Sequence, residues 1–286
     1  MSIEQSLGAL LGTEVHAARP VAGGDVCSAW YARTEDGREV FAKTHPRGAT
    51  MFAHEVAGLR WLAAAEAVRI PEVLAHDDTT LVLRWIHAGP RTPDSDAALG
   101  RGLAQLHRSG ATSFGWTADN ELAGLPQDNR ARDDWPSFYA QQRVLPLVKR
   151  CIDGGRLPAS TRTTFERLAE RMPALWGPAE PPARLHGDLW SGNAMTDTDG
   201  APVLFDPAVY GGHREIDLAM MQLFGGFAPT CFAAYDEVHP RAHEHEDRVE
   251  LAQLYPVLVH VALFGGHYAQ AAQRIARRYA GLTPTA

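Results

Sequence analysis

The sequence predicts an α+β fold with two lobes, a β-rich N-lobe over residues 1–88 and a mainly helical C-lobe over residues 89–286. Short runs of β-branched and aromatic residues fill the first third of the chain, which favours strands. Apolar residues in the remainder recur at three- and four-residue spacing, which favours helices. The change occurs at Ala88-Gly89-Pro90, where glycine and proline indicate a break between elements.

We expect the N-lobe to hold a five-stranded antiparallel sheet and one helix. Glu35-Asp36-Gly37 is typical of a hairpin turn, because glycine tolerates the positive φ that such turns require. The helix is expected over Met51–Ala65, where apolar residues recur every three or four positions. The runs expected to contribute strands are Val26–Arg33, Arg38–Thr44, Glu72–Ala75 and Leu81–Ile86.

The C-lobe is expected to consist mostly of helices, with a short strand at Val203–Phe205. The last helical stretch has two places where it can break, at Pro256 and at Gly265-Gly266. The periodic stretches expected as helices are Ala97–His107, Thr161–Arg171 and Leu251–Arg278.

The composition is that of an ordinary globular protein and disfavours several classes. The chain has 27 basic and 34 acidic residues and a net charge of −7, whereas a dedicated nucleic-acid binder usually has a basic face. The three cysteines include no C-x-x-C pair, so neither a disulfide framework nor a structural zinc site is expected. The chain start lacks the features of a secretory signal, and apolar runs such as Val257–Phe264 are too short to span a bilayer. We expect a cytoplasmic protein that binds neither nucleic acid nor membrane, and we favour a monomer.

The strongest functional signal is the segment from His186 to Asp206. It contains His186-Gly187-Asp188, then Asn193 five residues after that aspartate, and Asp206 directly after an apolar run. The spacing matches the kinase catalytic loop H-R-D-L-x-x-x-N and the aspartate that follows the next strand. Phosphoryl transfer depends mainly on positioning and charge neutralisation, which these groups supply.

Each of these residues has a candidate role in that chemistry. Asp188 is the candidate catalytic base, which accepts the proton of the attacking hydroxyl. Asn193 and Asp206 are candidate metal ligands, because amide and carboxylate oxygens suit Mg²⁺ better than zinc. Turn formation alone would also explain each residue, but it does not explain their joint spacing or the strand beside them.

Two N-lobe residues extend the pattern. Val40-Phe41-Ala42-Lys43 resembles V-A-I-K, whose lysine contacts the phosphates of ATP, and Glu55 follows on the expected helix, where it would hold that lysine. Each charge alone is more often solvated. Together with Asp188 they indicate an ATP site in a bilobal protein-kinase-like fold, with the N-lobe clamping the nucleotide.

Two further segments are candidates for nucleotide binding. Gly23 and Gly24 lie between expected strands, where glycines let backbone N–H groups approach phosphate, although a plain hairpin turn would look the same. The run that ends at Ile86 leads out of the sheet. The backbone groups of Arg84 and Ile86 are therefore candidates to bind adenine, a role compatible with an ordinary buried strand.

The surroundings of Asp206 argue against a protein kinase. Pro207-Ala208 replaces Phe-Gly, and proline restricts φ, so a flipping switch is not expected there. A helix is expected again by about Glu215, which leaves no room for a long activation loop. The site is expected to be permanently formed and suited to small substrates.

The chain resembles the fructosamine kinase (ketosamine 3-kinase) family, within the aminoglycoside-phosphotransferase-like kinases. The resemblance covers most of the chain. It is carried by His186-Gly187-Asp188-Leu189-Trp190-Ser191-Gly192-Asn193, by Asp206-Pro207-Ala208-Val209-Tyr210-Gly211-Gly212-His213-Arg214-Glu215-Ile216-Asp217, by Phe224-Gly225-Gly226-Phe227, by Ser113-Phe114-Gly115-Trp116 and by Leu125-Pro126-Gln127-Asp128-Asn129.

This resemblance implies ATP-dependent phosphorylation of the 3-hydroxyl of a sugar joined to an amine as a ketoamine, either a fructosamine or a ribulosamine. The phosphorylated adduct would fall apart and free the amine. The expected cofactors are ATP and Mg²⁺, and the expected partner is a small ketoamine or a glycated amine or protein.

Four residues are candidates for the acceptor side of the site. Trp190 offers an aromatic face to a sugar, although a buried packing role fits equally well. Asp217 either braces the catalytic loop or meets the substrate, and bracing is the preferred interpretation. His213 and Arg214 are expected near the pocket entrance, where they would contact the sugar or its amine-bearing group.

Two features have alternative interpretations. Where many family members have Gly-Gly-Cys, this chain has Gly23-Gly24-Asp25 with Cys27 two places later; that thiol is either redox-sensitive or, preferably, a buried strand residue. The histidines near residues 239–245 lack metal-site spacing, so a solvated charged segment is expected there.

Two other functions stay open. The first is another small-molecule kinase of this superfamily, acting on an aminoglycoside, choline or homoserine; the Trp190 and Asp206-Pro207 context favours ketoamines. The second is an inactive kinase fold that serves as a binding module, against which the intact Lys43, Glu55 and Asp188 argue.

Overall fold

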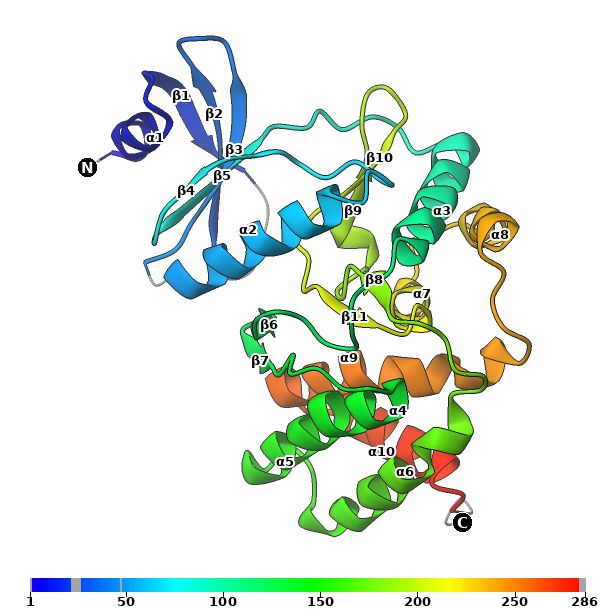
Figure 1. Ribbon diagram of the computed structural model, residues 1–286. Coiled ribbons are helices and arrows are strands. Elements are labelled where there is room, and N and C mark those ends of the chain that lie inside the picture. The colour runs from blue at the N-terminus through cyan, green and yellow to red at the C-terminus, as the bar shows by residue number, and fades with distance from the viewer. Residues whose placement is uncertain (1, 22–26, 47, 283–286) are drawn as a thin grey trace.

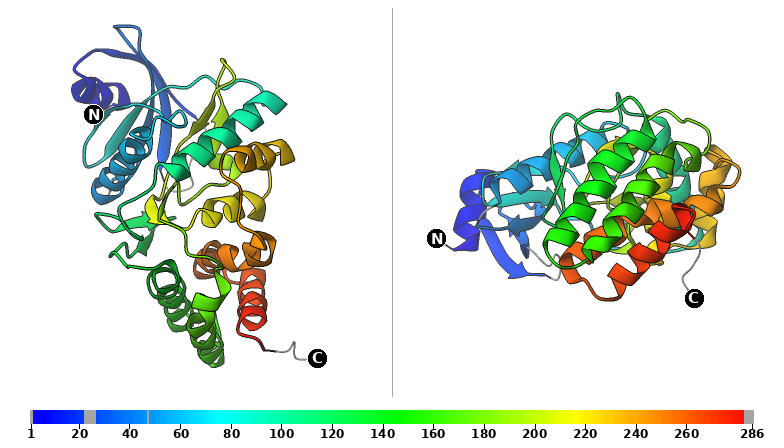
Figure 2. Two further views of the ribbon diagram at one scale, coloured as in Figure 1. Left: turned by 45° about the vertical axis from the view of Figure 1, so that its right-hand side comes forward. Right: turned by 90° about the horizontal axis from the view of Figure 1, so that it is seen from below.

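The computed structural model describes residues 2–21, 27–46 and 48–282. A sheet-based N-lobe sits on a larger helical C-lobe, and residues 85–92 join them (Figure 1). Two further views show helices gathered at the end of the C-lobe that lies away from the sheet (Figure 2). The two-lobed α+β fold predicted from the sequence is confirmed.

The N-lobe sheet is antiparallel throughout, with strand order β1-β2-β3-β5-β4. β5 lies between β3 and β4, so the strand that leaves the lobe is an interior one. Its buried residues Leu81 and Leu83 pack against Phe52 and Val56 of α2, the helix Ala49–Ala63. The strands are β1 (Val15–Pro20), β2 (Ser28–Thr34), β3 (Glu39–Thr44), β4 (Val73–His76) and β5 (Thr80–Arg84).

The prediction of one helix in the N-lobe was wrong, because a second helix, α1, spans Ile3–Leu11. A capping box starts it: the Ser2 side chain accepts from the Gln5 N–H, and the Gln5 side chain accepts from the Ser2 N–H. Leu7 is fully buried against the sheet residue Val15. The helix is thus held by its cap and by one apolar face.

The C-lobe places short strands among its helices. β8 (Ala183–Leu185) pairs with β11 (Tyr210–Gly212), and β9 (Ala194–Thr196) pairs with β10 (Pro202–Leu204). The catalytic-loop segment lies between β8 and β9. The remaining elements are α3 (Pro93–Arg108), β6 (Asn120–Leu122), β7 (Leu125–Gln127), α4 (Trp135–Phe138), a π-helical turn (Tyr139–Val144), α5 (Leu145–Asp153), α6 (Arg162–Leu175), α7 (Glu215–Leu223), α8 (Pro229–Val238), α9 (Val249–Phe264) and α10 (His267–Tyr279), with 3₁₀ turns at Ala159–Thr161, Ser191–Asn193 and His245–Arg248.

The last helical stretch breaks at only one of the two expected places. Gly265 and Gly266, with φ of 68° and 61°, separate α9 from α10. Pro256 lies inside α9, where its missing N–H would leave the carbonyl of Ala252 without a helical partner. The hydroxyl of Tyr139 donates to that carbonyl at 3.2 Å, so the helix continues through the proline.

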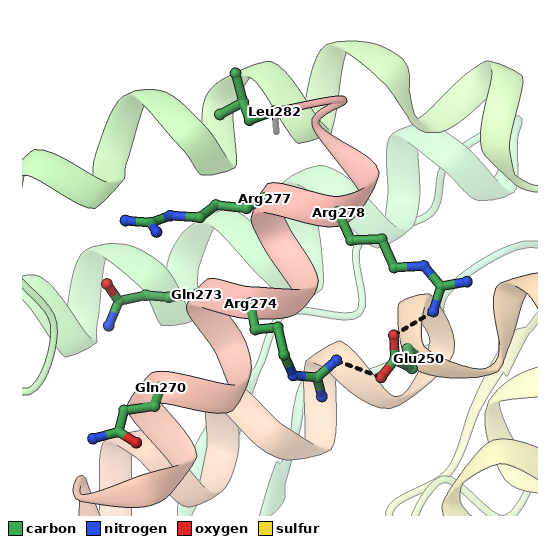
Figure 3. A pocket seen from close by; sticks show the side chains of 7 residues that line it. All are labelled: Glu250, Gln270, Gln273, Arg274, Arg277, Arg278 and Leu282. Atoms are coloured by element: carbon green, nitrogen blue, oxygen red, sulfur yellow. Dashed lines mark hydrogen bonds and ion pairs between the residues drawn. The ribbon is translucent and has the colours of Figure 1, made fainter. Parts of the chain in front are cut away.

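A surface hollow of about 710 Å³ runs along α10 (Figure 3). Arg274 and Arg278 each donate to the carboxylate of Glu250 at 2.6 Å across it. None of its lining residues belongs to the candidate site considered next. None of the helices in residues 2–21, 27–46 and 48–282 has both the length and the apolar character needed to cross a membrane.

The contact between α3 and α8 depends on a glycine. A Cβ added at Gly100 would lie 2.0 Å from the carbonyl oxygen of Cys231, and that oxygen is fixed in the backbone of α8. In an ordinary helix, alanine is about 1 kcal/mol more favourable than glycine. At Gly100 the clash is expected to reverse that preference.

We therefore expect Gly100→Ala to lower the free energy of unfolding by about 1–3 kcal/mol, because the two helices must separate. Thermal melting followed by circular dichroism measures this. Arg101→Ala, at the exposed neighbouring position, serves as the control and should stay within about 0.5 kcal/mol of the parent chain. A Gly100→Ala protein that melts at or above the parent temperature would show that the helices can yield.

Candidate active site

Asp188 and Asn193 meet in the loop between β8 and β9. The Asn193 side-chain Nδ2 donates to the Asp188 carboxylate Oδ2 at 3.0 Å and to the Asp188 backbone carbonyl at 2.8 Å. These bonds fix the orientation of the Asp188 carboxylate. They also turn the amide oxygen Oδ1 of Asn193 away from Asp188, so that this oxygen can serve as a metal ligand.

The environment of Asp188 favours proton acceptance near neutrality. Burial raises the pKa of this carboxyl to about 7 against the opposing hydrogen bond from Asn193, and the negative charges of Asp206 and Asp217 add to the rise. A carboxylate with such a pKa is a stronger base than an exposed aspartate. The position is therefore suited to accept the proton of a hydroxyl.

Asp217 braces the catalytic loop from inside. Its carboxylate is fully buried and accepts the backbone N–H groups of His186 at 2.8 Å and Gly187 at 2.9 Å. Burial opposes its charge, but His107, the charge of His186 and the bond from the Gly187 N–H hold the pKa of Asp217 below its usual value. The bracing interpretation is thus supported, whereas a contact between Asp217 and substrate is excluded by its burial.

Two residues that support Asp217 in turn, His107 and Tyr235, were not predicted from the sequence. The His107 ring in α3 contacts Asp217 through Nε2 at 3.2 Å and the Tyr235 hydroxyl through Nδ1 at 2.9 Å. His107 is the last residue of the helix expected over Ala97–His107, so a polar residue on a periodic apolar helix was the available signal. Its partner Asp217 is 110 residues away, and no local pattern announces that pairing.

Asp206 holds an unusual backbone conformation. Its φ is 56°, a region that few residues other than glycine adopt, and its carboxylate Oδ1 accepts from Lys43 Nζ at 2.6 Å. Lys43 also donates to Glu55 at 2.7 Å. Burial opposes the charge of Lys43, but the two carboxylates outweigh it and raise its pKa above the usual value. The lysine, both acids and the catalytic loop therefore form one cluster between the lobes.

A buried amide network holds the chain that follows Asp206. Asn120 donates to the carbonyl of Val209 at 2.8 Å, and Gln127 donates to that of Ala208 at 3.3 Å. Gln127 Nε2 also donates to the Asn120 Oδ1 at 3.0 Å. Further members of the network are Asn129, Arg143 and Tyr255. The β6–β7 hairpin therefore fixes the backbone at Ala208 and Val209, shortly after Asp206.

Trp190 is exposed, which disfavours the buried packing role. Its side chain is 41% accessible, although the indole ring folds back over Gly192, where an added Cβ would lie 2.2 Å from it. One face of the ring therefore rests on the loop and the rest is open to solvent. This arrangement suits a platform for a sugar.

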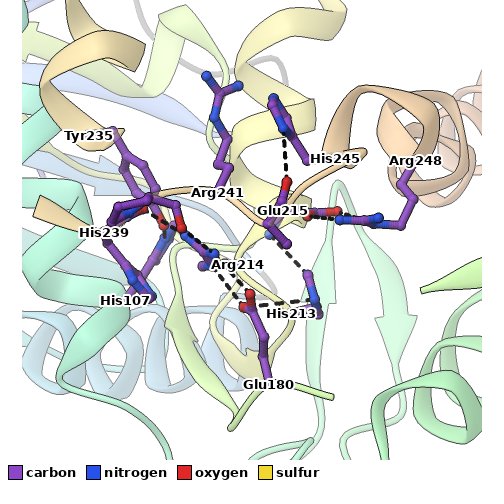
Figure 4. Close-up of polar contacts among 12 residues, drawn as sticks. His107, Glu180, His213, Arg214, Glu215, Tyr235, His239, Arg241, His245 and Arg248 are labelled. Atoms are coloured by element: carbon purple, nitrogen blue, oxygen red, sulfur yellow. Dashed lines mark hydrogen bonds and ion pairs between the residues drawn. The ribbon is translucent and has the colours of Figure 1, made fainter. Parts of the chain in front are cut away.

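The expected placement of His213 and Arg214 near the pocket entrance was wrong. Both side chains are buried, and Arg214 donates to both oxygens of Glu180 at 2.7 and 2.8 Å and to the carbonyls of His239 and Pro240 (Figure 4). The His213 ring lies 5.2 Å from that of Trp176. A buried guanidinium needs several acceptors, so Arg214 serves the interior of the C-lobe and not a ligand.

The other candidate positions have mixed outcomes. Gly23 and Gly24 lie outside the described residues. The Arg84 N–H donates to the carbonyl of Glu72 at 2.9 Å and is thereby used within the N-lobe. Within the described chain no hydrogen bond engages the backbone of Ile86. Ile86 is therefore the better candidate of the two for binding adenine.

Cys27 directly precedes β2 and is half-buried, so the expectation of a buried strand residue is met only in part. Burial raises the pKa of its thiol, which disfavours the thiolate. His243 and Glu244 are exposed, as expected of a solvated segment. No group of three or more histidine, cysteine or acidic side chains with metal-site geometry occurs in the described residues.

The amide network predicts how the turn after Asp206 is held. Asn120→Ala removes the donor to Val209, and it also removes one of the two acceptors of each of the buried amides of Gln127 and Asn129. Because unsatisfied buried groups are costly, we expect a loss of about 2–4 kcal/mol in stability and a fall in kcat of about tenfold.

Thermal melting and kcat at saturating substrates measure these two effects. Glu121→Gln, on the same hairpin, is the matched control and should change neither. An Asn120→Ala protein with parental melting temperature and parental kcat would show that the hairpin does not hold the turn.

Solved structures share this architecture. The crystal structure of a putative fructosamine-3-kinase from Thermobifida fusca aligns with a TM-score of 0.90 at 39% identity, covering 98% of both chains. The choline kinase LicA from Streptococcus pneumoniae aligns with a TM-score of 0.66 at 15% identity, over 98% of both chains, which shows a shared fold. The kinase-like fold predicted from the sequence is confirmed.

Curated sequences are similar over nearly the whole chain. A probable ketoamine kinase from Lactiplantibacillus plantarum is 37% identical over 273 residues, 93% of this chain and 95% of that protein. The chloroplastic protein-ribulosamine 3-kinase of Oryza sativa subsp. indica is 33% identical over 279 residues, 93% of this chain and 80% of that protein. The sequence profile described as fructosamine kinase matches residues 1–281. The resemblance seen in the motifs is thereby confirmed, and the chain belongs to the fructosamine kinase family.

Proposed function

We propose that this chain transfers the γ-phosphoryl group of ATP to a hydroxyl of a ketoamine, with Mg²⁺ as the metal. The observation that carries the proposal is the cluster in which Lys43, Glu55 and Asp206 meet beside Asp188 and Asn193. As a member of its family the chain is a phosphotransferase with an alcohol group as acceptor. The names of its relatives, ketoamine kinase and protein-ribulosamine 3-kinase, support a sugar–amine adduct and its 3-hydroxyl as the acceptor.

Different residues act on the acceptor hydroxyl and on ATP. Asp188, oriented by Asn193, accepts the proton of the acceptor hydroxyl as its oxygen bonds to the γ-phosphorus and the bond to ADP breaks. Lys43 supplies a positive charge for the phosphate oxygens, and Glu55 holds it in place. The backbone of Ile86 is the candidate contact for adenine, and Gly23 and Gly24 are candidates to cover the phosphates.

The donor set fits magnesium. The Asp206 carboxylate and the free amide oxygen of Asn193 are hard oxygen ligands, and Mg²⁺ prefers one or two such groups together with substrate phosphates. These two residues would hold the ion, which supplies charge neutralisation to the phosphates when bound. Neither cysteine nor histidine is part of the set, which disfavours zinc.

The product and the setting complete the proposal. We expect the phosphorylated ketoamine to break down and release its amine, so that the enzyme would remove sugars from amines or from glycated proteins. All three cysteines are free thiols, which fits a reducing compartment and supports a cytoplasmic location. We propose a monomer, because the cluster is assembled within one chain.

Replacing the base tests the assignment directly. We expect Asp188→Asn to lower kcat for a fructosamine by about 10²–10⁴-fold, because the amide cannot accept the proton. Release of ADP from Mg-ATP measures this, with a fructosamine, a ribulosamine and aminoglycosides offered as acceptors. Asp199→Asn, an exposed aspartate in the β9–β10 turn, is the matched control. Turnover by Asp188→Asn within about tenfold of the parent would remove Asp188 from this role.

Removing a ligand tests the metal. Asn193→Ala is expected to raise the Mg²⁺ concentration for half-maximal activity by about tenfold or more, because one oxygen ligand is lost. A chelator should abolish activity in the parent chain, and added Mg²⁺ should restore it. An unchanged Mg²⁺ dependence in Asn193→Ala would mean that this side chain only orients Asp188.

A further inference from the structure

Three large apolar residues are exposed among the residues that the structure describes. They are Trp190 at 41%, Phe224 at 42% and Phe264 at 64% accessibility. Single exposed apolar residues are ordinary, but exposed aromatic residues that gather on one surface mark a site of interaction. Where these three lie relative to one another and to Asp188 therefore decides whether they have a function.

Phe224 and Phe264 belong to one aromatic surface, which we define as Phe224, His260, Phe264 and Tyr268. The His260 ring is at its centre, with ring centroids 5.1 Å from Phe224, 5.8 Å from Phe264 and 4.8 Å from Tyr268. Phe224 directly follows α7, whereas His260 and Phe264 lie one turn apart on α9. The glycine turn at Gly265–Gly266 returns the chain, so that Tyr268 of α10 joins the same surface.

This aromatic surface continues into the catalytic loop. Gly226, two residues after Phe224, lies so close to Ser191 that an added Cβ would come within 2.6 Å of the serine side chain. Ser191 follows Trp190 and is three residues from Asp188. The surface is therefore at the acceptor side of the candidate active site.

The chemistry of a ketoamine matches this order of residues. Its nitrogen is attached to C1 of the sugar, close to the 3-hydroxyl that would approach Asp188, and it is an ammonium at neutral pH. Aromatic faces attract ammonium groups and bury methylene chains. A positive group near Trp190 and Phe224 would thus be followed by an alkyl chain over His260 and Phe264.

A positive charge near Phe264, at the end of the aromatic surface away from Asp188, agrees with that orientation of the ketoamine. Arg156 donates to the carbonyl of Phe264 at 3.4 Å, so a guanidinium stands beside the end of α9. A second positive group would be repelled there. The ammonium is therefore expected at the end nearer Asp188, and the uncharged chain at the end nearer Phe264.

We propose that the aromatic surface Phe224–His260–Phe264–Tyr268 binds the amine-bearing part of the ketoamine, and that a long aliphatic amine such as a glycated lysine side chain is its occupant. This rests on the proposed function. Trp190 and Phe224 face the ammonium, and the rings from His260 outward cover the methylenes. The surface thereby selects among ketoamines that share one sugar.

Two adducts of fructose separate the parts of this surface. The lysine adduct is formed on the ε-amine of Nα-acetyl-lysine N-methylamide, which has no second positive group, and the other is formed on methylamine, which lacks the chain. Phe264→Ala is expected to raise KM for the lysine adduct about five- to thirtyfold, because its apolar cover is lost. KM for the methylamine adduct, KM for ATP and kcat should stay within about twofold. Phe264→Tyr keeps the ring and is the matched control, with parental KM for both adducts.

Phe224→Ala is expected to raise KM for both adducts, because it contacts the shared ammonium. If Phe264→Ala leaves KM for the lysine adduct unchanged, or raises KM for both adducts alike, the assignment of the outer surface is overturned. If the parent chain phosphorylates neither adduct, the proposed function itself fails.

The competing occupant is a second copy of this chain. Light scattering on the parent chain and on Phe264→Ala tests it. A parental dimer that becomes monomeric in Phe264→Ala, with KM for the lysine adduct unchanged, would make the surface a self-interface and overturn the proposal. A monomer in both, with the expected change in KM, supports it.

Discussion

The site depends on one buried carboxylate, that of Asp217. It is fully inaccessible and must be compensated, because removing a partner from a buried charge costs several kcal/mol. Its partners are the His186 and Gly187 N–H groups and the His107 ring. These come from the catalytic loop and from α3, while Asp217 itself comes from α7. When α3, α7 and the catalytic loop pack so that the Asp217 carboxylate has its partners, the same packing positions Asp188.

A second constraint follows at Asp206, where the backbone has a positive φ that costs about 1–3 kcal/mol unless its surroundings impose it. Those surroundings act from two sides. From the N-lobe, Lys43 donates a hydrogen bond to the Asp206 carboxylate. From the C-lobe, the amides of Asn120 and Gln127 donate to the carbonyls of Val209 and Ala208. Because the β6–β7 hairpin supplies this support within the fold, the turn at Asp206 needs no movable loop to order it, in agreement with the short segment between Pro207 and α7.

The parts of the site that the sequence predicts are those encoded locally. Asp188 and Asn193 are five residues apart in one loop, and that spacing alone makes them candidates. The supporting residues were not predictable in this way, because His107 and Asn120 pair with partners 110 and 89 residues away. The same limit explains the error at Arg214: adjacency to a motif does not tell which way a side chain points, and its partner Glu180 lies in another segment. The fold class was predictable because composition and periodicity change once along the chain, whereas α1 was missed because its cap and Leu7 are weak signals.

The division between buried and exposed residues also separates reaction from specificity. Arrangements of this fold recur in choline kinase LicA at 15% identity, so the architecture does not define an acceptor. The residues that hold Asp188 are buried and mutually bonded, and a change in any of them disturbs the reaction itself. Residues that choose the acceptor must be free to vary without that penalty, which requires exposure beside the base. Trp190 and Phe224 meet that condition, whereas His213 and Arg214 do not. The exposed aromatic rings of Trp190 and Phe224 are therefore the residues that we propose to select the acceptor, whereas the buried charged pair of Arg214 and Glu180 cannot contact it.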